Sequence, residues 1–169
     1  LGVVADQALR DDPPRPPTRV IPRTPATVRL ESYSTAGYEA QVPSRWKLVA
    51  DDVDRGDFNE SRWTAPRPSR AQLVISYRQG SQASPRGIAE SARGRIAAQR
   101  TYSELAFGPI ALNGDEAYRW IYGVAGQTRA SWYLNPCGTS VAITGVTRPA
   151  EALRWAPTFR AVTASLRPT

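Results

Sequence analysis

The chemistry open to this 169-residue chain is limited first by what it lacks, since it contains no histidine and a single cysteine, Cys137. Serine–histidine and cysteine–histidine nucleophiles need an imidazole as general base, and the commonest zinc sites need one as a ligand. A lone cysteine in the sequence NPCG is neither a metal-binding pair nor a redox pair. No phosphate-binding glycine motif occurs either. We therefore expect a structural role for Cys137 and no enzymatic activity.

Carboxylates crowd at one place, between residues 51 and 60. The stretch contains Asp51, Asp52, Asp54, Asp57 and Glu60. A calcium loop places an acid or amide at alternate positions before its glycine, whereas here Arg55 stands where a ligand is needed. Two acids in one loop do not establish the cleft that glycoside hydrolysis requires. We interpret the stretch as a solvated acidic loop, and we expect no metal and no other cofactor.

Aromatic side chains are the remaining candidates for a functional surface. The candidate ligand or partner surface consists of Trp63, Tyr118, Trp120, Tyr122 and Trp132, and Tyr77 and Tyr133 belong to the same aromatic set. Strand periodicity places about half of such residues in the core, and packing is the favoured role for the set. Trp120 and Trp132 are expected on adjacent strands, where they could form a cross-strand pair. A deep pocket lined by either tryptophan would indicate a ligand sensor, and a flat patch an adaptor.

The net charge of +7 comes almost wholly from arginine, because Lys47 is the only lysine. A nucleic-acid-binding protein concentrates its basic residues with aromatic residues between them, whereas these arginines are scattered along the chain. Arg93, Arg95 and Arg100 are the nearest approach to a cluster, and we interpret them as a solvated helix face. We expect no nucleic-acid partner, although the charge suits anionic lipids or envelope polymers.

The elements that must position these residues are mainly strands. Alternating residues over 28–42 predict a β-hairpin that Pro43 ends, and a short strand is expected over 62–65. The nearly continuous apolar run at 71–77 predicts a central strand covered on both faces. Ser84 and Pro85 suit the N-cap and first position of a helix of about four turns.

The second half of the chain predicts an antiparallel meander and a closing helix. Strands are expected over 103–112, 115–124, 128–135 and 139–146, with Asn113-Gly114 as the hairpin turn between the first two. Leu153, Phe159, Val162 and Leu166 follow at helical spacing, with Pro157 as a kink or break. The order predicts an α+β fold: an α/β/α sandwich whose central antiparallel sheet has about six to seven strands, with a helix on each face.

Residues 1–26 are expected to be an N-terminal tail and proline-rich linker, followed by one globular domain over 27–169. The segment RDDPPRPPTRVIPRTPA is too rich in proline for a helix or an interior strand. The first residues suggest either a mature chain cut just after a transmembrane helix or signal peptide, or an ordinary frayed terminus. The first alternative is favoured, and it predicts a membrane tether upstream of Leu1 on a bacterial, extracytoplasmic protein.

Several of these pieces together resemble the superfamily that contains the photosystem II protein PsbP, the Mog-type Ran-binding factor and the LpqN-type bacterial lipoproteins. The resemblance covers residues 28–167. It is carried by VPSRW (Val42 to Trp46), by LVISY followed by a long helix, by LNGDEAYRW (Leu112 to Trp120), and by the closing helix that ends at Ser165-Leu166. It implies an α/β/α sandwich in which Pro43 lets the hairpin leave the sheet. Trp46 would then fold back to fill the gap between the sheet and a helix, with a surface-binding indole as the alternative.

The function expected from the residues and the resemblance together is that of a binding module. Members of this superfamily act as adaptors, assembly factors or binding modules, and a fold does not by itself specify a function. We expect a non-catalytic, extracytoplasmic adaptor domain that contacts a protein or an envelope component. The alternative is a sensor domain of a membrane receptor or kinase that binds a small molecule or sugar.

Overall fold

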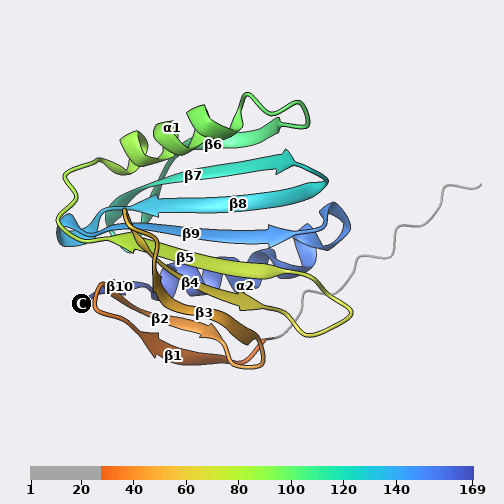
Figure 1. Ribbon diagram of the computed structural model, residues 1–169, viewed down its shortest axis with the longest axis horizontal. Coiled ribbons are helices and arrows are strands. Elements are labelled where there is room, and N and C mark those ends of the chain that lie inside the picture. The colour runs from red at the N-terminus through yellow and green to blue at the C-terminus, as the bar shows by residue number, and fades with distance from the viewer. Residues whose placement is uncertain (1–27) are drawn as a thin grey trace, which may run out of the picture.

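A computed structural model describes residues 28–169, which fold as one α+β unit with two antiparallel sheets and two helices (Figure 1). The expected tail and linker over 1–26 lie outside the described residues. The larger sheet has seven strands in the order β3-β4-β5-β9-β8-β7-β6. These strands are β3 (Lys47–Asp54), β4 (Asn59–Thr64), β5 (Gln72–Arg78), β6 (Ser103–Leu112), β7 (Asp115–Val124), β8 (Gln127–Leu134) and β9 (Ser140–Thr147). The expected α+β class and the antiparallel meander are confirmed.

A smaller sheet holds the N-terminal hairpin apart from the seven strands. It consists of β1 (Leu30–Ser34), β2 (Tyr38–Pro43) and β10 (Arg167–Pro168), in the order β1-β2-β10. The first hairpin therefore leaves the main sheet at Pro43, and β3 starts the larger sheet only four residues later, at Lys47. Proline cannot donate a ladder hydrogen bond, so it is tolerated at the end of a strand, and Pro43 is the last residue of β2.

The two helices begin and end for local reasons. In α1 (Pro85–Ile96), the Ser84 hydroxyl caps the N-terminus by accepting a hydrogen bond from the Gly87 amide at 3.1 Å. The second helix, α2 (Ala152–Ser165), follows the short 3-10 turn η2 (Pro149–Glu151). It continues through Pro157, so the expected break is not present. No helix within residues 28–169 is both long and apolar enough to cross a membrane.

Alternate residues of the same strands supply two separate hydrophobic clusters. On β8, Trp132 and Leu134 belong to the larger cluster, which also contains Phe159 of α2. Their neighbour Tyr133 belongs to the smaller cluster, which contains Ala89 of α1. Because side chains alternate across a strand, the two clusters draw on opposite sides of β8. Figure 1 shows α2 behind the sheet and α1 along the edge that β6 and β7 form.

Trp46 closes the junction between the two sheets and α2, as the resemblance implies. Its side chain is only 7% exposed, which excludes the alternative of a surface-binding indole. The indole ring meets Trp155 of α2 edge-on at a centroid distance of 5.1 Å, and Phe159 at 6.2 Å. Trp46 therefore packs the corner that the departing hairpin would otherwise leave open.

Three local expectations are wrong. Leu153 does not share the buried face that its helical spacing with Phe159 suggests: it is 88% exposed, because the buried face of α2 starts at Trp155. The acidic stretch is not one loop: Asp51, Asp52 and Asp54 lie in β3, which pairs with β4 through irregular register. Pairing with a neighbouring strand overrides the low β-propensity of aspartate.

The third error concerns the coverage of β5. Leu73, Ile75 and Tyr77 are buried in the larger cluster, whereas Val74 and Ser76 on the other side are only half-buried. The strand is central but is not covered on both faces, because α1 packs on β7 and β8 and does not extend over β5. This uncovered side of β5 forms part of the candidate site.

Candidate functional site

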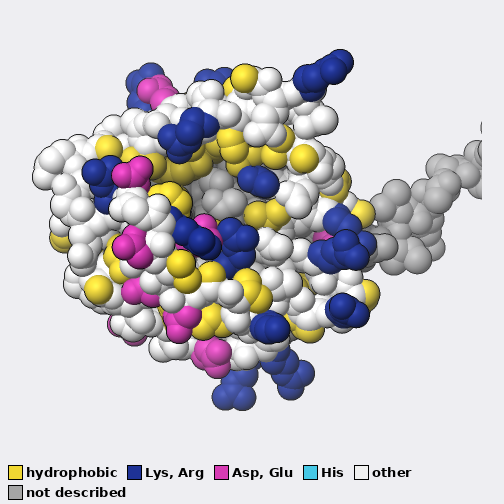
Figure 2. All heavy atoms as spheres, viewed as in Figure 1, with side chains coloured by type: hydrophobic (Ala, Val, Ile, Leu, Met, Phe, Trp, Pro, Cys, Tyr) yellow, Lys and Arg dark blue, Asp and Glu magenta, His cyan; other side chains and the backbone are white. Residues whose placement is uncertain are grey.

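A groove runs beside α1 on the side of the main sheet that α1 only partly covers. It comprises two neighbouring cavities of about 310 and 740 Å³ that share Ala92, Arg95, Tyr133 and Thr144 as lining residues. Cavities of this size suit small-molecule ligands. Figure 2 shows the hollow in the middle of this face, bordered by hydrophobic and arginine side chains.

The floor of the groove follows from strand register. Arg62, Val74, Thr144, Ser131 and Trp120 are successive partners across β4, β5, β9, β8 and β7. They therefore form one row across the sheet, and all five line the smaller cavity. The floor is polar at its centre, where the Ser131 and Thr144 hydroxyls are hydrogen-bonded at 2.9 Å.

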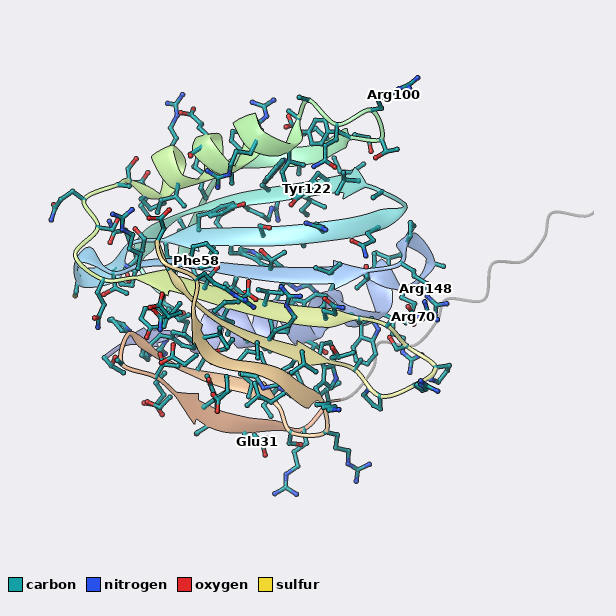
Figure 3. All side chains as sticks on the ribbon, in the orientation of Figure 1. Glu31, Phe58, Arg70, Arg100, Tyr122 and Arg148 are labelled. Carbon is teal, nitrogen blue, oxygen red and sulfur yellow. The ribbon has the colours of Figure 1, made fainter. Side chains whose placement is uncertain are left out.

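The wall of the groove is α1, and its far end is the turn between β3 and β4. From α1, the half-buried Ile88, Ala92 and Ile96 face the sheet, and Ser91 and Arg95 border the opening. Asp57 and Phe58 line the larger cavity at its far end. Figure 3 shows the two labelled aromatic residues, with Phe58 by this turn and Tyr122 below α1.

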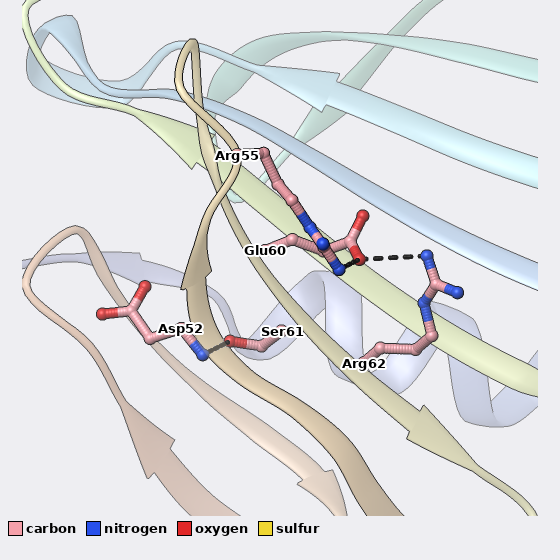
Figure 4. Close-up of polar contacts among 5 residues, drawn as sticks. All are labelled: Asp52, Arg55, Glu60, Ser61 and Arg62. Atoms are coloured by element: carbon pink, nitrogen blue, oxygen red, sulfur yellow. Dashed lines mark hydrogen bonds and ion pairs between the residues drawn. The ribbon is translucent and has the colours of Figure 1, made fainter.

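Positive charge dominates the lining of the smaller cavity. Arg62, Arg95 and Arg129 line it, against the single acid Glu60. Glu60 is itself bound by two arginines, Arg55 at 3.1 Å and Arg62 at 2.9 Å. Figure 4 shows both guanidinium groups converging on this carboxylate. Among the described residues, Arg95 and Arg129 have no carboxylate within ion-pair distance, so the cavity carries an excess of positive charge.

Several buried polar atoms of the groove have no hydrogen-bond partner among the described residues. They include the Nε atoms of Arg62 and Arg129 and the hydroxyl of Ser140, a residue more than nine-tenths buried. A buried polar group without a partner costs free energy, and native proteins retain few of them. Burial also raises the pKa of Tyr133, so its phenol stays protonated and can donate a hydrogen bond in the groove.

The five aromatic residues expected to form a surface are all buried and divide between the two clusters. Tyr118, Trp120 and Tyr122 lie in the smaller cluster with α1, whereas Trp63 and Trp132 lie in the larger one. Only Trp120 and Tyr122 of the five line the groove. The structure therefore does not bring the five together on one surface.

Trp120 and Trp132 do not form the expected cross-strand pair. They lie on adjacent strands, but Trp120 is opposite Ser131, and Trp132 is opposite Arg119. This one-residue offset sends the two indoles to opposite sides of the sheet.

The groove residues that carry charge and polarity were not predicted from the sequence. In β5, the polar residues Gln72, Ser76 and Arg78 alternate with apolar residues, which is the pattern of a strand covered on one face only. Cys137 is also not a packing residue, because it is exposed in the turn η1 (Pro136–Gly138) with φ 52°. Within residues 28–169, no group of three or more acidic or cysteine side chains could hold a metal ion.

The architecture just described is the PsbP/LpqN-like fold, so the resemblance seen in the sequence is confirmed at the level of the fold. Comparison of the sequence with protein-family models and with curated proteins finds no match.

The solved structures that share this fold include three of bacterial proteins. One is cyanobacterial PsbP (CyanoP) from Synechocystis sp. PCC 6803, with 14% identity and a TM-score of 0.59 over 85% of this chain and 95% of that one. The putative regulator PA94 of Pseudomonas aeruginosa, a protein of unknown function, has 18% identity and a TM-score of 0.53 over 83% and 97%. LpqN, involved in cell envelope biogenesis of Mycobacterium tuberculosis, has 12% identity and a TM-score of 0.53 over 85% and 92%. At these identities the likeness establishes the fold alone.

Proposed function

We propose that the chain is a non-catalytic, extracytoplasmic binding domain that holds its ligand in the groove beside α1. The observation that carries the proposal is the groove itself, a cavity beside Trp120 with free arginine donors and unpaired buried polar atoms. A pocket lined by Trp120 is the feature that favours the ligand-binding alternative over a flat adaptor surface. The proposal includes a helix on each face of the main sheet, since α1 and α2 pack on clusters that alternate along β8.

The composition of the groove supports binding without catalysis. Its buried carboxylate, Glu60, is held by two arginines and therefore poorly suited to act as a general base. The unpaired hydroxyl of Ser140 has no histidine to activate it, because the chain contains none.

The envelope assignment is part of the proposal and has two supports. LpqN, which shares the fold, is described as involved in cell envelope biogenesis. The proline-rich segment before the folded domain suits a spacer from an upstream tether. On this proposal, the folded domain stands outside the cytoplasmic membrane and recruits an envelope component.

Filling the groove is expected to abolish ligand binding. Ala92 is half-buried and lines both cavities, so Ala92→Trp adds an indole where a ligand would lie. The measurement is a ligand-observed NMR screen of neutral and charged fragments, with amide shifts used to locate each hit on the wild-type chain. Hits should shift the amides of Ser131 and Thr144 and should fail to bind the variant.

Glu90→Trp is the matched control, since it adds the same side chain to the exposed face of α1. Thermal unfolding of both variants checks that each remains folded. If fragments bind only outside the groove, or bind Ala92→Trp as well as wild type, the groove is not the binding site. The shift map on wild type decides this even if the variant fails to fold.

A second function, protein docking on the edge strand β3, is favoured by a separate observation. Of the six large hydrophobic residues that are exposed within 28–169, four lie on β3 or in the turn that follows it: Leu48, Val49, Val53 and Phe58. An edge strand offers unpaired backbone groups to an extended segment of a partner protein. This surface would serve the adaptor role expected from the sequence.

Val49→Lys is expected to remove such docking by placing a charge on the edge. Leu105→Lys is the control, because Leu105 is 63% exposed on β6, at the opposite edge of the same sheet. Photo-crosslinking from β3 in envelope extract, followed by identification of the attached peptide, measures the contact. Equal crosslinking by the two variants would count against docking on β3.

A further inference from the structure

We infer that the groove binds an organic acid, with its carboxylate or phosphate at Arg129 and its apolar body between α1 and the apolar side chains of β5 and β9. This inference rests on the proposed function, because it names the class of ligand for the same groove. It follows from the charge of the smaller cavity, from its free donors and from the shape of its apolar wall.

The charge of the smaller cavity calls for an anion. Three arginines line it, and Glu60 is the single acid among the lining residues. The Glu60 carboxylate is already bound by Arg62 and by Arg55, which does not line the cavity. The cavity is partly shielded from water, so charges interact there more strongly than on an open surface. A neutral ligand would leave this excess unbalanced, whereas one anionic group would reduce it.

Arg129 supplies donors of the smaller cavity that no carboxylate occupies among the described residues. Arg129 on β8 and Arg62 on β4 are separated by β9 and β5 and lie in rows two residues apart, a backbone distance of about 16 Å at ordinary strand spacing. Both side chains line the same cavity, but the Arg62 guanidinium is bound to Glu60 and the Arg129 guanidinium is turned toward Gln127. Each keeps a buried Nε without a partner among the described residues, and Arg129 otherwise bonds only the neutral Gln127, at 3.1 Å. Guanidinium groups bind carboxylate and phosphate oxygens with two parallel hydrogen bonds.

The apolar wall explains why the acid should carry an organic body. Ile96 and Ala92 of α1 face Val74 and Val146 of the sheet across the smaller cavity. The Trp120 ring is fully buried and stacked on Tyr122 at 3.7 Å, so that ring face is already in use. A base-stacking platform of the kind that binds single-stranded nucleic acid is therefore not offered here. An aliphatic or compact aromatic body fits the wall better than a nucleobase.

The test compares an acid with its neutral amide of the same shape. Calorimetric titration of the chain with 2-naphthoate, 2-naphthamide and inorganic phosphate measures the three affinities. We expect 2-naphthoate to bind about tenfold more tightly than the amide, the difference that one charge-assisted contact provides. Its affinity should fall as salt is raised, and phosphate without an apolar body should bind more weakly than 2-naphthoate.

Arg129→Gln is expected to weaken 2-naphthoate binding about tenfold and to leave 2-naphthamide binding unchanged. Arg129 is the better position to test, since removing Arg62 would also release Glu60 from an ion pair. Arg119→Gln is the matched control: Arg119 lies on β7 next to Trp120, but is exposed and points to the other side of the sheet. It should leave both affinities unchanged.

The inference is overturned if the amide or inorganic phosphate binds as tightly as 2-naphthoate, if no acid binds, or if Arg129→Gln changes nothing. The chemical shifts of the backbone amides, recorded by NMR in a parallel titration, separate this failure from failure of the proposed function. Neutral compounds that bind in the groove without using Arg129 would leave the binding role intact and exclude only the acid. Thermal unfolding of Arg129→Gln confirms that a loss of affinity is not a loss of fold.

Discussion

Trp46→Ala is expected to lower the free energy of unfolding by roughly 3–5 kcal/mol, the usual cost of truncating a buried tryptophan. The indole is 7% exposed and meets Trp155 and Phe159 edge-on. Edge-to-face aromatic pairs add to the free energy gained by burial. The site cannot collapse easily, because Pro43 ends β2 on one side and β3 begins at Lys47 on the other.

Urea unfolding followed by circular dichroism measures this change. Leu153→Ala is the control, since Leu153 is a large apolar residue of α2 that is 88% exposed, and its truncation should change stability by less than about 0.5 kcal/mol. Equal losses for the two variants would mean that Trp46 does not seal the junction. Ligand binding in the groove should survive Trp46→Ala wherever the variant stays folded, because Trp46 lines neither cavity.

The sequence was most informative where local signals and tertiary packing agree. Asn113-Gly114 predicts a tight turn, and both residues adopt positive φ between β6 and β7. Ser84 predicts a helix cap and supplies one. The motif from Pro43 to Trp46 predicts a chain reversal with a buried indole, because proline ends a ladder and a large ring needs a packed site. Each signal involves only a few neighbouring residues.

The groove could not be predicted because it depends on which strands α1 covers. The apolar residues of β5 looked sufficient for a strand buried on both faces, yet α1 packs on β7 and β8 and leaves Val74 half-exposed. Arg62 and Arg129 are 67 positions apart in the chain, and only the strand order β4-β5-β9-β8 places them around one cavity. Likewise, the one-residue offset that separates Trp120 from Trp132 is a property of register, which composition does not specify.

Gly145→Ala is expected to destabilise the chain by about 1–3 kcal/mol or more, as overpacking of a tight core does. Gly145 lies in β9, and a Cβ added there would overlap the ring of Phe159, which is 3% exposed in α2. The ring is held in turn by Trp46, so it cannot move aside freely. The close approach of α2 to β9 therefore requires glycine, which has no side chain, at position 145.

Gly94→Ala is the matched control, because Gly94 lies in α1 with open space around its added Cβ. Alanine should stabilise α1 there by about 0.5–1 kcal/mol, so the same substitution has opposite signs at the two sites. Urea unfolding of both variants, and of Gly145→Ala combined with Phe159→Leu, measures the effect. The smaller side chain should recover part of the loss, since residues in contact do not contribute additively. The contact between α2 and β9 is less tight than the structure shows if Gly145→Ala is as stable as wild type. The same follows if Phe159→Leu lowers the free energy of unfolding as much in the double variant as it does alone.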